Sequence, residues 1–593
     1  MLWQKGGAGV VWRRLIAALL ALVLVGASAC SAPKETEKPV PGGTVTIGLQ
    51  RGLSGSLRPL VSDGPVAPAV IQLMYSGLLR QGPKSELVCD LCEEYSVSAD
   101  RRTLTFRLRQ DVQWHDGKPL TAEDVAFTYR SMLDPGHTGA HAGELAALVG
   151  VQALLDGRDE VDRQFAAARF GAAEAQVRKQ TAWQKWLEGP GKQAIAVVDG
   201  HTVVFTMDQP YAPLLTAMRL PISPAHTQAP VGTGPFRLEE HQKGQFVRLV
   251  RHEGYHLGKP YLDRVVLRIA PAGKALELLR TGELDFVPLS AAEATEAART
   301  AAAAAAQEGR GGAAAKERTA GPVLRVVTWP GAGYQYLGVN HVRAPFADVR
   351  VRQALMYGIN RKALVDALLH GRGAVVNAHL APGHWAGEGL TLNPYDFDRT
   401  RAAELLAEAG WSAVDGQGYR TKEGERLRFA LKVPRGNPVR EASARQIQQD
   451  LKALGIQVDV QVLDFAQVAR EVFGERQADA WLLGWDLGLD PDPGPIFSPD
   501  NKWGSGAGWS NARSEELLRQ GRQVLDAGER QAVYAEWLQL INKELPYLFL
   551  YAEDEVAGVR ADRLRGLAPD VRGALWNIWQ WWIPAAQQEA ALQ

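Results

Sequence analysis

Apolar and polar residues alternate in several short stretches of the chain, and this pattern predicts strands. The alternation runs through 43–49, 102–108, 202–207 and 456–462, and a glycine-rich turn within 231–238 leads into another strand. Short apolar runs at 480–485 and 545–551 are too brief for surface helices and predict two further strands.

Apolar residues at helical spacing predict the helices. They are expected at 70–79, after Thr121, through most of 139–193, after Asp348 and Asn360, at 399–409 and at 440–454. Asp124 lies three residues after Thr121, the spacing of a capping box. The order helix, strand, helix, strand after residue 399 predicts an α/β architecture with crossovers.

The strand at 480–485 runs into an acidic, proline-rich loop. The loop carries Asp486, Asp490 and Asp492 between three prolines, which restrict the backbone. In open α/β sheets, ligands bind outside the carboxyl ends of the strands. The loop is therefore a candidate ligand site, and a proline-ordered surface turn is the alternative.

Composition limits the class of protein. A chain of 593 residues predicts two or three domains. Basic and acidic residues balance at 66 each, so no basic surface for nucleic acid is expected. No phosphate-binding glycine motif follows a strand, and we expect no cofactor.

The first thirty residues have the layout of a secretory signal. Arg13 and Arg14 precede an apolar run at 15–25, which is short for a membrane span, and small residues lead into Cys30. This arrangement resembles a bacterial lipoprotein signal, which implies a lipid on Cys30, with plain secretion as the alternative. The polar segment 31–41 is expected to be a flexible tether.

Cys89 and Cys92 are the remaining cysteines. Outside the cytoplasm they predict a local disulfide, with a pair of inert thiols as the alternative. A zinc site would need two more ligands, and no second CxxC is present.

Other reactive side chains favour structural roles. His115 and Asp116 are adjacent in a turn, with no nucleophile placed by a motif. His379 and His384 are expected to be solvated loop histidines rather than metal ligands. We therefore predict neither a catalytic nor a metal site. The alanine-rich segment 291–320 is expected to be a surface insertion, and the tryptophan cluster at 576–584 to be core with a cleft wall as the alternative.

Several blocks together resemble the extracytoplasmic solute-binding proteins of peptide/nickel ABC importers, family 5. They follow in the family's order: LTFRLRQDVQWHDGKPLTAEDVAFTY from 104, GTGPFRL from 232, YLGVNHVRAPFADVRVRQALMYGINRKALV from 336, AAELLAEAGW from 402, the GW…DPDP loop at 484–493 and ELPYLFLY from 544.

The resemblance implies a type II periplasmic-binding-protein fold, with two lobes joined by a hinge. Domain I would comprise 41–78, 200–330 and 548–593, domain II 79–199 and domain III 331–547. The ligand would lie in a cleft between domains I and III, without catalysis. A monomer tethered outside the cytoplasmic membrane would deliver a peptide to a membrane permease. The alternatives are an oligosaccharide or nickel-chelate receptor, a sensor and a secreted hydrolase.

The resemblance also implies the site residues. Trp485 lies where family members contact the ligand, and Asp490 or Asp486 would bind the amino terminus of a peptide. The family commonly has an aspartate three residues after this tryptophan, where this chain has Gly488. Further candidates for the site are Tyr336, Asn340, Trp385 and Trp503.

Overall fold

The computed structural model describes residues 37–50, 52–61, 64, 68–136, 141–167, 169–308, 322–498 and 507–588, without the side chains of 303–308. The chain divides into two compact units, 1–40 and 41–593, and everything below concerns the second. Cys30 and Trp503, which the sequence singles out, lie outside the described residues.

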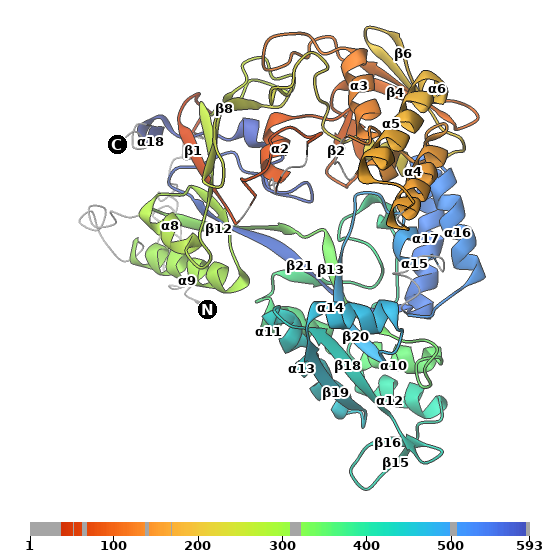
Figure 1. Cartoon of the computed structure of the whole chain (residues 1–593). Helices are drawn as coiled ribbons and strands as arrows, with labels where there is room; N and C mark the ends of the chain where they lie inside the picture. The colour runs from red at the N-terminus through yellow and green to blue at the C-terminus, as the bar shows by residue number, and fades with distance from the viewer. Residues whose placement is uncertain are drawn as a thin grey trace, which may run out of the picture. The chain divides into compact units, whose positions relative to one another are not determined.

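A 12-stranded sheet organises the fold, and its strand β21 (Tyr547–Arg560) belongs to both halves of the sheet (Figure 1). The first residues of β21 pair with β13 (Gly333–Val339) and β14 (Gly373–Val375). The later residues pair with β12 (Leu324–Pro330) and β11 (Phe286–Pro288). One continuous strand therefore connects the two halves.

The half around β11 contains the N-terminal strand. Its strands are β1 (Thr44–Leu49), β8 (Phe236–Gln242), β9 (Phe246–Arg251) and β10 (Arg264–Ile269), and its helices are α2 (Pro68–Met74), α8 (Ala275–Thr281) and α9 (Ala291–Glu308). Buried Asp285 accepts hydrogen bonds from Thr46 N at 2.8 Å and from the Arg563 guanidinium at 2.8 Å. This pair ties the C-terminal segment to β1.

The half around β13 contains the acidic loop. Its further strands are β18 (Arg428–Pro434), β19 (Gln457–Leu463) and β20 (Ala480–Asp486). The helices packed on it are α10 (Val349–Gly358), α11 (Arg361–Leu368), α12 (Arg399–Glu408), α13 (Pro438–Lys452), α14 (Phe465–Ala469), α15 (Gly494–Phe497), α16 (Ala512–Gln523) and α17 (Ala527–Glu544). A small hairpin sheet is formed by β15 (Ala413–Val414), β16 (Arg420–Lys422) and β17 (Glu425–Arg426).

A separate four-stranded sheet is formed by the part of the chain that follows β1 and precedes β8. It contains β4 (Cys92–Val97), β5 (Thr103–Leu108), β7 (Thr202–Thr206) and β6 (Ile195–Asp199). Beside it lie the hairpin β2 (Leu79–Gln81) and β3 (Leu87–Cys89), and the helices α3 (Ala122–Met132), α4 (Val151–Ala166), α5 (Ala172–Glu188), α6 (Pro190–Ala194) and α7 (Leu214–Ala217). A disulfide joins Cys89 to Cys92.

Most predicted elements are present, and two expectations need correction. The helix expected at 70–79 ends at Met74, because Leu79 N donates to Met218 O at 3.0 Å and begins hairpin β2–β3. The alanine-rich segment is not purely a surface insertion. Ala294 and Ala297 of α9 are buried in a core with Leu279 and Leu324. Its continuation at 309–320 lies outside the described residues.

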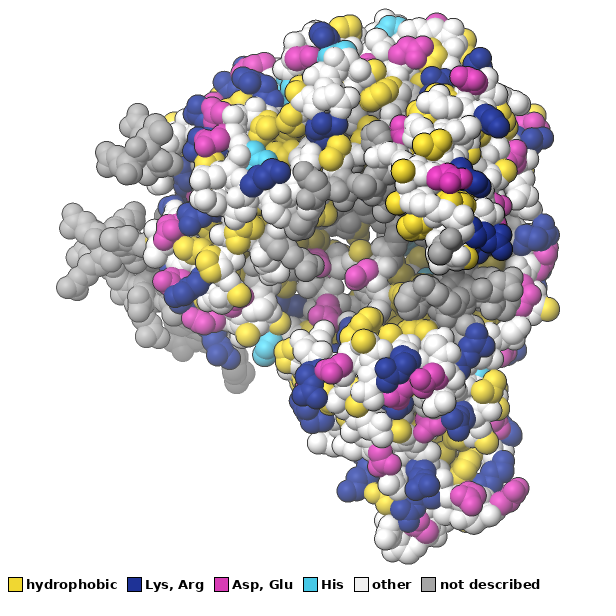
Figure 2. Space-filling view, viewed as in Figure 1, with side chains coloured by type: hydrophobic (Ala, Val, Ile, Leu, Met, Phe, Trp, Pro, Cys, Tyr) yellow, Lys and Arg dark blue, Asp and Glu magenta, His cyan; other side chains and the backbone are white. Residues whose placement is uncertain are grey.

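His115 joins two sequence blocks that are far apart in the chain. Its Nδ1 accepts from Gly232 N at 3.1 Å, and its Nε2 donates to Gly234 O at 3.0 Å. A Cβ at Gly232 would lie 1.8 Å from Met74 O, so only glycine fits beside α2. His115 therefore positions a loop, as expected for a structural histidine. Figure 2 shows acidic and basic side chains interspersed over the visible face, in keeping with the balanced composition.

Candidate functional site

Trp485 lies at the carboxyl end of β20, where it is half-buried. Its ring is parallel to that of Tyr336, with centroids 6.2 Å apart, and Tyr336 stacks on Tyr547 at 4.2 Å. Tyr336 is fully buried. Tyr336 therefore lies within the core beside the indole, whereas Trp485 stays partly exposed.

A cavity of about 430 Å³ opens beside this indole. Its lining includes Trp485, Asp486 and Gly488 of the loop, together with Tyr211 and Pro213. Small-molecule sites commonly measure about 300–1,000 Å³, with apolar walls and a few polar groups. The cavity accordingly has the size and lining of a binding site for a small solute.

Asp490 is not available as a free anchor for an amine. Its two carboxylate oxygens accept from Arg530 Nη2 at 2.6 Å and Arg530 Nη1 at 2.8 Å. Burial acts to lower the pKa of Arg530, and the carboxylate more than offsets this, so that pKa lies above the ordinary arginine value. The structure favours a loop-holding role for Asp490 over the amine-binding role that the sequence suggested.

A second ion pair holds the same loop. Asp492 accepts from Arg522 Nε at 2.9 Å and from Gly494 N at 3.0 Å. Burial raises the pKa of Asp492 despite the guanidinium. Two of the three loop carboxylates thus fix the loop to α16 and α17.

Asp486 is the loop carboxylate that remains exposed, and it belongs to an acidic group on the neighbouring strands. Arg440 has both Glu553 and Asp486 among its charged neighbours, and burial is the main cause of its lowered pKa. Burial also raises the pKa of Glu553. Burial, and then the charge of Asp486, raise the pKa of Glu555. Two carboxylates, Glu553 and Asp486, therefore act on the Arg440 guanidinium, and the charge of a third, Glu555, acts on Glu553.

Hydrogen bonds order the centre of this acidic group. Gln335 donates to Glu553 at 3.3 Å and accepts from Arg440 Nε at 3.1 Å. The sequence analysis missed Glu553, Glu555 and Arg440. The run at 553–555 follows the strand predicted at 545–551, so this acidic run was the available signal.

His379 and His384 are buried, so the prediction of solvated loop histidines is wrong. The Tyr334 hydroxyl lies 2.6 Å from His379 Nδ1, and burial lowers the pKa of His379 to about 3. His384 Nδ1 accepts from Ala386 N at 3.2 Å, which leaves Nε2 to donate to Leu489 O at 3.0 Å. The neutral imidazole of His384 therefore helps to hold the loop.

Two further predicted residues lie apart from the cavity. Asn340 is buried and donates to Arg476 O at 3.2 Å and Ala478 O at 3.1 Å, so its amide is used within the protein. Trp385 begins a short 3₁₀ turn, where its N–H donates to Lys84 O at 2.8 Å, and it does not line the Trp485 cavity. Neither residue lines the Trp485 cavity.

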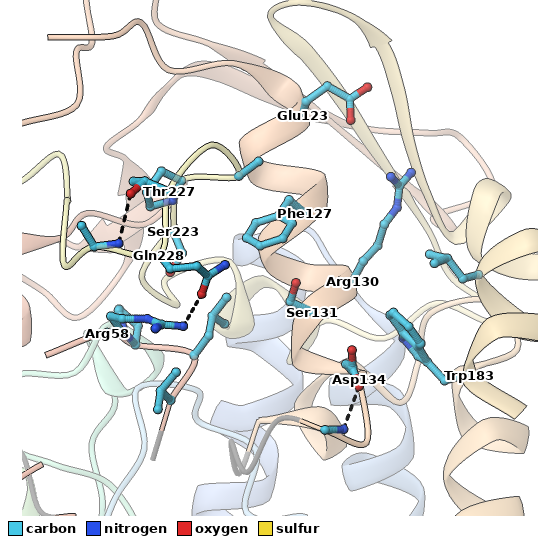
Figure 3. Close-up of a pocket in the computed structure, with 18 of the residues that line it drawn as sticks. Arg58, Glu123, Phe127, Arg130, Ser131, Asp134, Trp183, Ser223, Thr227 and Gln228 are labelled. Carbon is cyan, nitrogen blue, oxygen red and sulfur yellow. Dashed lines mark hydrogen bonds between the residues drawn. The ribbon is translucent and has the colours of Figure 1, made fainter. Parts of the chain in front are cut away.

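A larger cavity of about 950 Å³ lies beside α3 and α5 (Figure 3). Phe127 and Trp183 contribute aromatic surface to it. Three basic and three acidic side chains line it, Arg58, Arg130 and Lys192 against Glu123, Asp134 and Glu188. This cavity is large, but its lining has equal numbers of basic and acidic side chains, so its charge does not favour a charged ligand. Among the described residues, no group of three or more potential metal ligands is present, and no helix is long and apolar enough to cross a membrane.

Comparison with known proteins places these features in a family. Residues 86–507 match the model of bacterial extracellular solute-binding proteins, family 5. The chain belongs to this family. Protein XP55 of Streptomyces lividans, a similar sequence, is 30% identical over 576 residues, which cover 92% of this chain and 91% of that protein.

Oligopeptide-binding protein AppA of Bacillus subtilis is 26% identical over 558 residues, covering 93% of this chain and 94% of AppA. The AppA structure in complex with a nonapeptide matches with a TM-score of 0.60 at 24% identity, over 92% of this chain and all of that one. NikZ from Campylobacter jejuni, in complex with Ni(L-His), matches with a TM-score of 0.60 at 21% identity, over 91% of this chain and all of that one. These structural matches show the fold. They confirm the expected type II periplasmic-binding-protein fold, and the family model confirms the resemblance to family 5.

Proposed function

We propose that this chain is the substrate-binding component of an ABC importer that captures short peptides beside Trp485. The acidic group formed by Asp486, Glu553 and Glu555 carries the proposal, because among the described residues these three carboxylates outnumber their neighbouring cation, Arg440. A protonated amino terminus is the part of a peptide that such a group attracts. Family membership and the peptide-binding relatives support the same ligand class.

Within this proposal, the fixed loop and the exposed carboxylate have separate roles. Arg530 and Arg522 hold the loop, so Trp485 and Asp486 are in position before a ligand arrives. Preorganisation of this kind reduces the entropy lost on binding. The peptide backbone pairs with protein backbone, which leaves the side-chain sequence of the ligand largely free.

We also propose how the domains move and where in the cell envelope the protein acts. Domain I (41–78, 200–330 and 548–593) and domain III (331–547) close on the peptide by a hinge motion, and the liganded form engages the permease. The chain acts as a monomer outside the cytoplasmic membrane, where a lipid on Cys30 anchors it. It performs no catalysis.

Native mass spectrometry of the gently purified protein tests the ligand class. We expect a set of short peptides that is released on denaturation and identified by sequencing. A single oligosaccharide or a metal chelate in their place would contradict peptide capture while leaving the family assignment intact. If no molecule is retained, titration with short peptides decides the question, and failure of every peptide to bind would contradict the proposal.

A further inference from the structure

A third cavity, of about 570 Å³, lies where hairpin β2–β3, residues 219–221 and the C-terminal segment meet. Its lining includes Arg80, Arg219, Arg572, Tyr255, Trp576 and Trp579. It shares no lining residue with the Trp485 cavity, so an inference from it does not depend on peptide capture.

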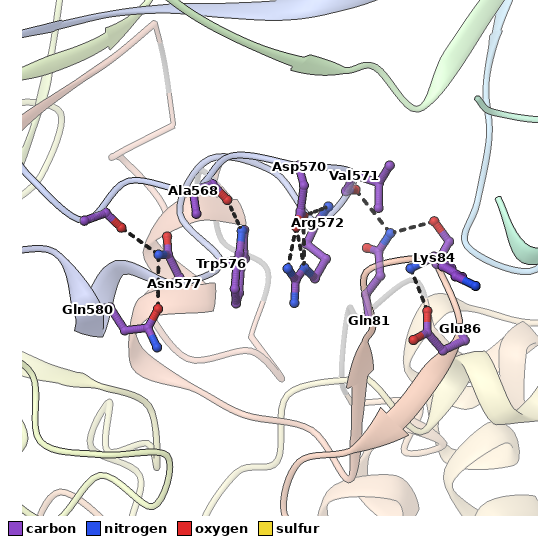
Figure 4. Close-up of polar contacts among 12 residues, drawn as sticks. Gln81, Lys84, Glu86, Ala568, Asp570, Val571, Arg572, Trp576, Asn577 and Gln580 are labelled. Carbon is purple, nitrogen blue, oxygen red and sulfur yellow. Dashed lines mark hydrogen bonds and ion pairs between the residues drawn. The ribbon is translucent and has the colours of Figure 1, made fainter. Parts of the chain in front are cut away.

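One of its arginines is fully engaged by the protein. Arg572 donates to Asp570 through Nε at 2.9 Å, and its guanidinium lies 3.3 Å from the centre of the Trp576 ring. Figure 4 shows this pair beside Gln81, which donates to Val571 O at 3.2 Å. Trp576 Nε1 in turn donates to Ala568 O at 2.5 Å. This wall of the cavity is therefore rigid before any ligand binds.

The other two arginines have no such partner. Within the part of the chain that the structure describes, the guanidinium groups of Arg80 and Arg219 make neither a hydrogen bond nor an ion pair, and the Nε of each is buried. Burial lowers the pKa of Arg219, which shows that its surroundings disfavour the charged form. Both side chains are half-buried, and each has a desolvated Nε without an acceptor, which costs free energy that a bound anion would recover.

The nearest carboxylates are occupied by other groups. Asp90, which also lines the cavity, lies 2.8 Å from His256 Nε2. Glu144, whose charge acts on Arg219, lies 2.7 Å from His141 Nδ1. The lining thus carries three guanidinium groups and one carboxylate, and it favours an anionic ligand.

Aromatic surface surrounds the two unpartnered arginines. Trp576 and Trp579 are half-buried and stand at right angles, with ring centroids 6.0 Å apart. Tyr255 lies against Trp579 at 5.7 Å. The tryptophan cluster is therefore divided. Trp581 and Trp582 are core, as the sequence analysis favoured, whereas Trp576 and Trp579 form the wall of a cavity.

We infer that this cavity binds the carboxylate of an organic acid whose body is aromatic or aliphatic. Arg80 and Arg219 supply planar donor forks that match a carboxylate, and the tryptophans accept the apolar body. A free inorganic anion would use the arginines but would leave the aromatic wall uncovered.

The test compares N-acetyl-phenylalanine with its uncharged amide, using the full-length protein and isothermal titration calorimetry. We expect the acid to bind at least about tenfold more tightly than the amide, since the two differ in the charge that the arginines recognise. Arg80→Gln and Arg219→Met should each weaken binding of the acid by about tenfold or more. Arg513→Met is the matched control. It removes an exposed guanidinium that pairs with Glu536, away from this cavity, and should leave the affinity unchanged.

Thermal unfolding separates a binding role from a structural role. Arg219→Met should raise Tm, because it replaces a half-buried charge whose Nε has no acceptor with an apolar chain of similar length. A lowered Tm would make Arg219 a structural residue and overturn the inference. It would be overturned equally if the acid did not bind, if acid and amide bound alike, or if both cavity variants retained the affinity of the unmodified protein.

Discussion

Asp490 and Arg530 form a two-point ion pair, at 2.6 and 2.8 Å, that fixes the acidic loop to α17. Both side chains are almost fully buried. The pair gives Asp490 a structural partner, and for this reason we propose the exposed neighbour Asp486 as the contact for a peptide amine.

Removing one partner of this pair should destabilise the protein strongly. Asp490→Ala leaves Arg530 buried without its anion, and we expect a loss of about 3–5 kcal/mol in the free energy of unfolding. Urea denaturation followed by tryptophan fluorescence measures the change. In the double variant Asp490→Ala/Arg530→Met, most of the loss should be recovered, because the orphaned charge is gone. An Asp490→Ala protein of unchanged stability that no longer binds peptide amines would contradict the structural role.

Asp486→Asn should weaken peptide binding but leave the stability of the protein almost unchanged. The side chain is exposed, so we expect the unfolding free energy to change by less than about 0.5 kcal/mol. Affinity for peptides with a free amino terminus should fall by about tenfold or more, which calorimetry measures. N-acetylated versions of the same peptides provide the control, since they lack the positive charge. Equal weakening of both peptide forms would refute a specific contact with the amine.

Gly232→Ala should disrupt the junction between the His115 turn and α2. The new methyl group would lie 1.8 Å from Met74 O, so the backbone must shift, and we expect a cost of about 3 kcal/mol or more. Gly157→Ala is the matched control. Gly157 lies within exposed α4 with no neighbouring atom within 4 Å of the added carbon, and the change should stabilise the helix by about 0.5–1 kcal/mol. Chemical denaturation of the two variants should therefore give shifts of opposite sign.

Buried neutral histidines predict a loss of stability in acid. Burial lowers the pKa values of His115, His341 and His379 to about 3 each. Because an unfolded histidine titrates near about 6.5, the unfolded chain binds more protons below that pH, and stability falls as pH decreases from about 6.5 towards 3. Each histidine should contribute a loss of about 2 kcal/mol between pH 6.5 and pH 5.

His379→Asn provides the test of this pH dependence. The variant should be less stable at pH 7 because it loses the Tyr334 contact, but its unfolding free energy should fall less steeply between pH 6.5 and pH 5. The exposed residue His370 supplies the control, since His370→Asn should leave the steepness unchanged. An unchanged slope in His379→Asn would show that His379 does not contribute to the acid sensitivity.

Local patterns in the sequence predicted most of the elements, because alternation and caps depend on neighbouring residues. The box at Thr121 and Asp124 forms as expected, with Thr121 N donating to the carboxylate at 3.0 Å. The partner of Asp490 lies forty residues further along the chain, in helix α17, and no local pattern identifies it. Glu553 was missed for the same reason, since only the pairing of β21 with β13 brings it near Gln335 and Arg440.

The continuity of β21 has a mechanical consequence. Because residues 547–553 pair with β13 and β14 and residues 554–560 pair with β12, neither half of the sheet can rotate against the other without bending this strand. Bending would strain the strand, and this strain would oppose rotation of the two halves in either direction. Glu553 lies where the pairing partner of β21 changes from β14 to β12. A cation bound by Glu553 would therefore act on the strand at the point where its pairing partners change.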